Sequence, residues 1–192
     1  MDEVMAREIE VNEELLEESE FLDDPEQQDE LRRMFKFDQR RVLLGVGACA
    51  ALGEECRRLG ARRALLVRDP AVKRLGEAVR QALQQGGVEV VAEYTAVVAN
   101  PTTASVDDLA AVVGRTACDA VVALGGGSTL DSAKVALCVA TSGGSCEDYL
   151  GFDRFPGPAR WPLLALPTTS GTGAEASRVA VIVAAQGKQA IY

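Results

Sequence analysis

The residues best suited to chemistry form a glycine-rich run in the second half of the chain. This run reads Gly-Gly-Gly-Ser-Thr-Leu-Asp-Ser-Ala-Lys over residues 125–134 and follows an apolar segment, 119–124. Successive glycines carry no Cβ, so a bulky ligand can approach their backbone closely. A helix that starts after them turns its free N–H groups and the positive end of its dipole toward the same gap. The run therefore predicts a phosphate-binding turn.

A tight strand-to-helix turn that binds no ligand is the alternative interpretation of this run. We favour the binding turn because three consecutive glycines cost backbone entropy that a simple turn does not require. The run is not a Walker A loop, since no Gly-Lys-Ser/Thr closes it, and it does not match G-x-G-x-x-G. Ser128 is expected to cap the helix, with Asp131 at the capping-box position and Lys134 one turn later.

A second polar cluster follows the apolar segment 163–166. Residues 167–175 read Pro-Thr-Thr-Ser-Gly-Thr-Gly-Ala-Glu, which gathers four hydroxyl groups and two glycines. Hydroxyls can donate to phosphate or ribose oxygens without adding charge, although a polar Ser/Thr turn without a ligand is also common. If both clusters follow strands of one parallel sheet, they lie on the same rim and reinforce each other.

A single acidic residue, Asp69, ends a third apolar segment, 64–68. A carboxylate in this position can accept hydrogen bonds from both hydroxyls of an adenosine ribose, and it repels a 2′-phosphate. The following Pro70 leaves an ordinary Asp-Pro turn open as the alternative.

The elements that position these residues alternate along the chain. Continuous apolar runs are typical of strands buried on both faces, and helices of ordinary length separate them here. We expect strands at 42–46, 64–68, 88–92, 119–124, 163–166 and 179–184, and helices at 48–59, 72–85, from 105 with a capping box to Asp108, and 128–140. This order predicts an α/β fold with a parallel sheet, whose strand carboxyl ends share one rim.

The composition excludes several classes of function. Residues 1–38 hold 15 acidic and four basic residues, whereas the rest of the 192-residue chain is nearly neutral. We predict that 1–38 is a partly disordered acidic extension and that 39–192 is one α/β domain. The extension is unsuited to nucleic acid, because phosphates would be repelled, but an interaction arm for a basic partner stays open.

Histidine is absent from the whole sequence, and the five cysteines form no C-x-x-C pair. There is therefore no Ser-His-Asp triad, no Cys-His pair and no imidazole metal ligand. An odd number of scattered cysteines favours reduced thiols and a cytoplasmic location. No apolar run reaches the roughly 18 residues of a membrane span, so we expect no membrane association.

The glycine-rich run, followed by the threonine-rich cluster, resembles the iron-type (group III) alcohol dehydrogenase family. Leu-Leu-Val-Arg-Asp at 65–69 and Asn-Pro-Thr at 100–102 resemble it too, and the likeness extends from Phe37 to Tyr192. The resemblance implies an N-terminal NAD(P)-binding domain of dehydroquinate-synthase-like fold. In that family a C-terminal helical domain carries an Asp and three His for iron or zinc. The chain ends before that region, so we expect it to lack the helical metal domain and to be a fragment or a split subunit.

The resemblance also implies roles for individual residues. Gly126, Gly127 and Ser128 would hold a pyrophosphate, and Asp69 the adenosine ribose, with NAD favoured over NADP. Thr168, Thr169 and Thr172 would line the phosphate and nicotinamide-ribose end. Asn100 would lie near the cofactor cleft, and Lys188 would correspond to a family lysine near the nicotinamide ribose. Lys134 and Lys188 are candidates for electrostatic help, although neither provides a complete site.

The implied function is hydride transfer between an alcohol and a nicotinamide cofactor. We predict that this chain alone is inactive, because it offers no histidines for the family's iron or zinc. Completed by a metal half, it would act on a small alcohol or aldehyde. An exposed apolar face would favour self-association or a protein partner. The alternatives are a non-catalytic nucleotide-binding or interaction module with an acidic arm, and a relative such as maleylacetate reductase.

Overall fold

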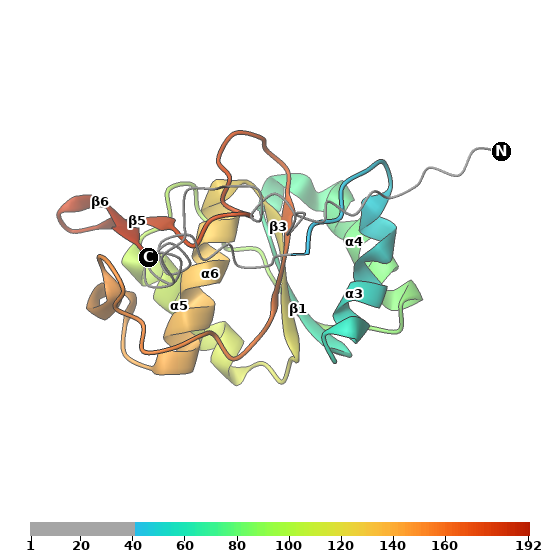
Figure 1. Cartoon of the computed structure of the whole chain (residues 1–192), viewed down its shortest axis with the longest axis horizontal. Coiled ribbons are helices and arrows are strands. Elements are labelled where there is room, and N and C mark those ends of the chain that lie inside the picture. The colour runs from blue at the N-terminus through green and yellow to red at the C-terminus, as the bar shows by residue number, and fades with distance from the viewer. Residues whose placement is uncertain (1–40) are drawn as a thin grey trace, which may run out of the picture. The chain divides into compact units, whose positions relative to one another are not determined.

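A computed structural model of the chain describes residues 41–192, and its folded unit comprises Cys49–Tyr192. The predicted extension 1–38 lies outside the described residues, so the division into two domains stays a prediction. The centre of the unit is a parallel sheet with strand order β2-β1-β3-β4 (Figure 1). Its strands are β1 (Arg63–Arg68), β2 (Glu89–Tyr94), β3 (Ala120–Gly125) and β4 (Leu163–Pro167).

Helices cover both faces of this sheet (Figure 1). Helices α3 (Leu52–Arg58) and α4 (Lys73–Gln85) lie on one face, and α5 (Thr103–Arg115) and α6 (Gly127–Ser142) lie on the other. Short 3₁₀ turns are η1 (Ala48–Ala51), η2 (Pro70–Val72) and η3 (Cys146–Tyr149). Strands β5 (Ala180–Ala184) and β6 (Gly187–Ile191) form a separate antiparallel hairpin, and β5 packs against α6.

Alternation along the strands explains why they read as continuous apolar runs. In β1, Leu65 and Val67 pack toward α5 and α6, whereas Ala64 and Leu66 pack toward α3 and α4. All four side chains are fully buried. A strand whose side chains pack into two hydrophobic cores has no polar face, which is typical of parallel sheets covered by helices on both sides. The predicted parallel α/β fold is confirmed.

The strand order places a topological switch point between the neighbouring strands β1 and β3. The connection from β1 leads to β2 on one side, and the next strand, β3, pairs with the other side of β1. The loops after β1 and β3 therefore diverge, and such switch points are where ligands bind in open parallel sheets. Asp69 N donates to Leu124 O at 3.0 Å, and Thr168 N donates to Gly125 O at 2.9 Å. The three predicted polar segments thus meet at one rim.

Two sequence predictions about local structure are wrong. Residues 42–46 form no strand, and Val42, Leu44 and Val46 are exposed. An extended apolar run becomes a strand only where a neighbour takes up its backbone hydrogen bonds. Helix α5 begins at Thr103, and its N-cap is Thr102, with Ser105 as the reciprocal capping-box partner. Ser105 does not start the helix, because its hydroxyl accepts from Thr102 N at 2.9 Å.

The cysteines are free, and three of them are buried. Burial raises the pKa of Cys146 to about 12, with a further contribution from the carboxylates of Asp107 and Glu147. These thiols serve as small core side chains. Within residues 41–192, no helix combines the length and apolar character needed to cross a membrane.

Candidate functional site

A cavity of about 300 Å³ opens at the rim of the sheet. It brings together five of the residues that the resemblance assigned to the cofactor, from four separate segments, and Asp131 of α6 lines it as well. They are Asn100 before α5, Gly127 and Ser128 at the start of α6, Thr172 after β4, and Lys188 on β6. Asp69, Gly126, Thr168 and Thr169 do not line this cavity.

The three glycines of the turn make close contact with threonine side chains. A Cβ on Gly125 would lie 2.2 Å from Thr129 Oγ1. A Cβ on Gly126 would lie 3.2 Å from Thr169 Oγ1, and one on Gly127 would lie 3.1 Å from the methyl of Thr172. The glycine-rich turn and the threonine-rich cluster are therefore packed against each other. Glycine is required here for packing as well as for ligand access.

Helix α6 begins one residue earlier than predicted, which corrects the roles of two side chains. Its N-cap is Gly126, whose backbone is extended, and no described side chain caps the first turn. Ser128 is thus inside the helix, and its Oγ accepts from Asn100 N at 3.2 Å. Asp131 is not a capping-box residue, because its Oδ2 accepts from Val181 N at 3.0 Å. The uncapped first turn keeps its N–H groups available to an anion.

Asn100 adopts a backbone conformation that few residues tolerate. Its φ of 53° lies in the left-handed region, where asparagine is several-fold enriched among non-glycine residues. This conformation accompanies the hydrogen bond to Ser128, and it fixes the segment before α5 against the start of α6. Strained positions of this kind cluster at ligand sites.

The threonines divide into two groups. Thr168 and Thr169 are exposed directly after β4, and Thr169 packs over Gly126 instead of lining the cavity. Thr172 reaches the cavity, and its Oγ1 accepts from Ala174 N at 3.3 Å. Thr172 is therefore the one of the three predicted threonines that lines the cavity.

Asp69 forms the turn that the sequence left open. Its Oδ1 accepts from Ala71 N at 2.8 Å and caps η2. The preceding Arg68 forms an ion pair with Glu93 and donates to Asp69 O at 3.3 Å. Among the described residues, Asp69 Oδ2 accepts no hydrogen bond, so that oxygen is available at the carboxyl end of β1. A capping role and a ribose-binding role are compatible.

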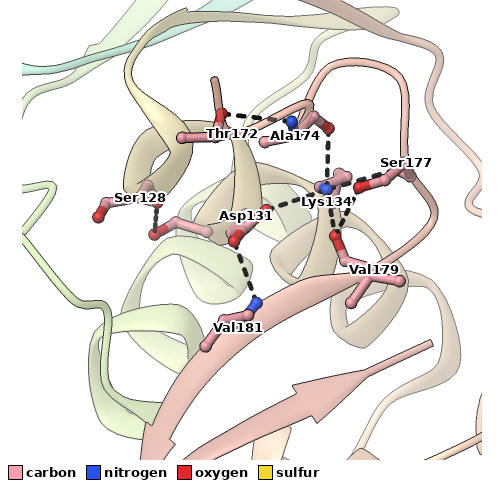
Figure 2. A network of polar contacts seen from close by, with 9 residues as sticks. Ser128, Asp131, Lys134, Thr172, Ala174, Ser177, Val179 and Val181 are labelled. Carbon is pink, nitrogen blue, oxygen red and sulfur yellow. Dashed lines mark hydrogen bonds and ion pairs between the residues drawn. The ribbon is translucent and has the colours of Figure 1, made fainter. Parts of the chain in front are cut away.

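Lys134 is the residue whose role the sequence did not predict. Its Nζ donates to the carbonyl oxygens of Ala174 at 2.9 Å, Ser177 at 3.4 Å and Val179 at 2.6 Å (Figure 2). Its three protons are engaged by these carbonyls, and Asp131 Oδ1 lies 2.9 Å away as an ion-pair partner. Lys134 does not line the cavity, and its three donors are engaged by carbonyl oxygens, so electrostatic help from it stays a prediction. Spacing on the helix gave no signal for contacts 40 residues or more away.

The described residues do not suit the metal that the resemblance implied. Residues 41–192 contain no group of three or more His, Cys, Asp or Glu side chains that could hold an ion. The whole sequence has no histidine. We therefore assign no step to a metal in this chain.

Fold and cavity together define a parallel α/β domain whose candidate site lies at the start of α6, directly after β3, beside the β5–β6 hairpin. The family model for iron-containing alcohol dehydrogenase matches residues 39–192. The chain belongs to this family.

Similar proteins are found among several alcohol dehydrogenases and related enzymes. A 4-hydroxybutyrate dehydrogenase from Cupriavidus necator is 41% identical over 152 residues, covering 77% of this chain and 39% of that protein. The crystal structure of a 1,3-propanediol oxidoreductase aligns with TM-score 0.70 and 34% identity, covering 76% of this chain and 38% of that one. An NADH-dependent butanol dehydrogenase A from Thermotoga maritima aligns with TM-score 0.69 and 29% identity, covering 77% and 38%. This chain thus spans about two fifths of their length.

Proposed function

We propose that this chain is the NAD-binding half of an alcohol dehydrogenase of the iron-containing family. The observation that carries the proposal is the uncapped start of α6 within the three-glycine run, which faces the rim cavity beside Thr172 and Lys188. Backbone N–H groups at a helix N-terminus bind the phosphates of a dinucleotide without a charged side chain. One structural relative is named as NADH-dependent, which supports the same cofactor.

The residues on the rim suit the successive parts of a dinucleotide. Asp69 Oδ2 would accept from the hydroxyls of the adenosine ribose at the end of β1. Gly126, Gly127 and Ser128 would bind the pyrophosphate. Thr168 and Thr169, on the exposed side of the rim, would contact the phosphates from outside the cavity. Within it, Thr172, Asn100 and Lys188 would contact the nicotinamide ribose.

Charge at the end of β1 favours NAD over NADP. The Asp69 carboxylate repels a 2′-phosphate, and Arg68 is engaged by Glu93 and by the Asp69 carbonyl oxygen. Arg68 is therefore not available to neutralise a second negative group. A nicotinamide ring, when bound, supplies the acceptor or donor of a hydride. The substrate class would be a small alcohol or aldehyde, as the names of the relatives suggest.

Binding of NADH is the direct test of this proposal. We expect saturable enhancement of NADH fluorescence by the purified 192-residue chain, with NADPH binding more weakly. Asp69→Gly should lower the ratio of NADH affinity to NADPH affinity by about fivefold or more, since the interaction of two charges near 4 Å amounts to about 1 kcal/mol even in water. Absence of NADH binding at millimolar concentration, by a chain with a cooperative thermal transition, would overturn the proposal.

Turnover is a separate question with a separate test. We propose that this chain alone oxidises no alcohol, because its described residues offer no metal cluster. Incubation with Fe²⁺ or Zn²⁺, NAD and a series of primary alcohols should give no NADH absorbance above the rate without protein. Appreciable turnover would contradict the inactivity but not the proposed cofactor.

A further inference from the structure

The threonine-rich cluster and the β5–β6 hairpin are both attached to helix α6 through two side chains (Figure 2). Lys134 binds three carbonyl oxygens of the segment 174–179, and Asp131 accepts from Val181 N on β5. The two side chains also contact each other at 2.9 Å. One face of a single helix therefore holds both segments that carry Thr172 and Lys188 into the cavity.

The contacts of Lys134 leave it no capacity to bind a ligand directly. Its side chain is only 17% exposed, and that of Asp131 is 14% exposed. An ammonium group offers three donors, and all three point to backbone carbonyls. The nearby carboxylate offsets the cost of keeping this charge half-buried. Lys134 thus organises the peptide backbone around it.

The segment that Lys134 holds makes few backbone hydrogen bonds of its own. Residues 168–173 are all exposed, and the backbone bonds that fix the stretch before β5 run from Thr168 N to Gly125 O and from Ala176 N to Gly173 O. Ala174 is the one buried residue of the segment 168–179, and its carbonyl is one of the three that Lys134 binds. Without Lys134, these carbonyls would turn toward water and the segment would lose its fixed position.

We propose that Lys134, supported by Asp131, is a positioning residue for the nicotinamide end of the bound dinucleotide. The proposal rests on the proposed function for its ligand, and on the contacts above for its mechanism. Lys134 holds Thr172 and Lys188 at the cavity and leaves the adenosine end, at Asp69, to the sheet. Its loss should therefore affect the two ends of the nucleotide unequally.

The attachment itself can be tested by limited trypsin digestion of the full chain. Arg178 is exposed and lies between Ser177 and Val179, two residues whose carbonyls Lys134 binds. In Lys134→Met, cleavage after Arg178 should accelerate about tenfold, the factor expected for loss of one buried charged hydrogen bond. Cleavage after the exposed Arg154 serves as the internal reference and should not change. Lys73→Met, at the exposed start of α4, is the matched control.

The effect on the ligand is tested by comparing NADH with ADP, which lacks the nicotinamide end. Lys134→Met should weaken NADH binding about tenfold and ADP binding by less than about threefold, with the far-UV circular dichroism spectrum unchanged. A purely structural defect would weaken both ligands equally. Asp131→Asn can keep an oxygen acceptor for Val181 N, but it removes the charge and turns an amide NH2 donor toward Lys134 Nζ, so it should show the same pattern.

The outcomes are distinguishable. Equal cleavage after Arg178 in the wild type and Lys134→Met overturns the proposed attachment. Equal weakening of NADH and ADP overturns the positioning role. If Lys134→Met does not fold, Asp131→Asn decides, and a wild-type cleavage pattern in it overturns the inference. A wild-type chain that binds no NADH overturns the proposed function and the ligand part of this inference, while the trypsin comparison still tests the attachment.

Discussion

The glycine-rich turn and the threonine-rich cluster lie on the same rim but are held by different means. The turn joins a fully buried central strand to a 16-residue helix, and regular backbone hydrogen bonds fix it on both sides. The threonine-rich segment leaves an edge strand, is mostly exposed, and depends on a lysine side chain from another element.

The difference indicates that the glycine-rich turn is part of the regular backbone structure, whereas the threonine-rich segment is held by side-chain contacts. A change in the turn should lower the stability of the fold where the new Cβ points into the core, as at Gly125. It should weaken ligand binding where the new Cβ points toward the cavity, as at Gly127. Changes in the threonine-rich segment should act on ligand binding with little effect on stability. Stability should therefore distinguish Gly125, which packs against buried Thr129, from Gly127 and from the threonine-rich segment.

The largest effect is expected where the turn contacts its own helix. In Gly125→Ala the new Cβ would lie 2.2 Å from Oγ1 and 2.6 Å from Cβ of Thr129, which is buried. Rotation about χ1 of threonine cannot move its Cβ away, so the strand or the helix must shift. We expect the free energy of unfolding to fall by about 2 kcal/mol, as for other overpacked cores. Urea denaturation followed by far-UV circular dichroism measures it.

A matched glycine shows whether this loss comes from the contact. Gly114 lies in α5 and is exposed, and a Cβ added there would have no atom within 4 Å. Gly114→Ala should raise the free energy of unfolding by about 0.5–1 kcal/mol, because glycine lowers helix stability. If Gly125→Ala were as stable as the wild type, the turn would not be a rigid part of the fold.

An intermediate effect is expected two residues further on, and on a different quantity. In Gly127→Ala the new Cβ faces the cavity and lies 3.1 Å from the Thr172 methyl, which belongs to the exposed segment and can give way. The unfolding free energy should change by less than about 0.5 kcal/mol. NADH affinity should fall about tenfold, because the ligand can no longer approach the backbone N–H groups closely. Isothermal titration calorimetry, with Gly114→Ala as control, measures it; unchanged affinity would place the phosphates elsewhere.

The sequence predicted the first of these two regions better than the second. Continuous apolar runs such as 119–124 identify buried strands, and glycine before a helical pattern marks the turn, because both signals are local. The strand at 42–46 was wrongly predicted because an apolar run does not reveal whether a pairing partner exists. The start of α6 also differs from the prediction, since Gly126 rather than Ser128 occupies the N-cap position.

Contacts distant along the chain could not be predicted. Lys134 and Val179 are 45 residues apart, and a lysine in a helix has many solvated alternatives to binding carbonyls. Asp131 likewise reaches Val181 across 50 residues. The motif suggested that these residues belong to the site, but it did not indicate that they act on the backbone of another loop.

The smallest effect is expected for a single hydroxyl in the threonine-rich segment. Thr172→Val keeps the shape that packs on Gly127 and removes only Oγ1, whose hydrogen bond from Ala174 N is long at 3.3 Å. Because Thr172 is exposed, the unfolding free energy should stay within about 0.5 kcal/mol of the wild type. NADH affinity should fall about threefold to fivefold, which corresponds to the net free energy of one neutral hydrogen bond. Thr172→Ser, which keeps the hydroxyl, should restore most of it. If Val and Ser variants bound NADH equally, the methyl contact with the glycine turn, and not the hydroxyl, would be the contribution of this segment to the site.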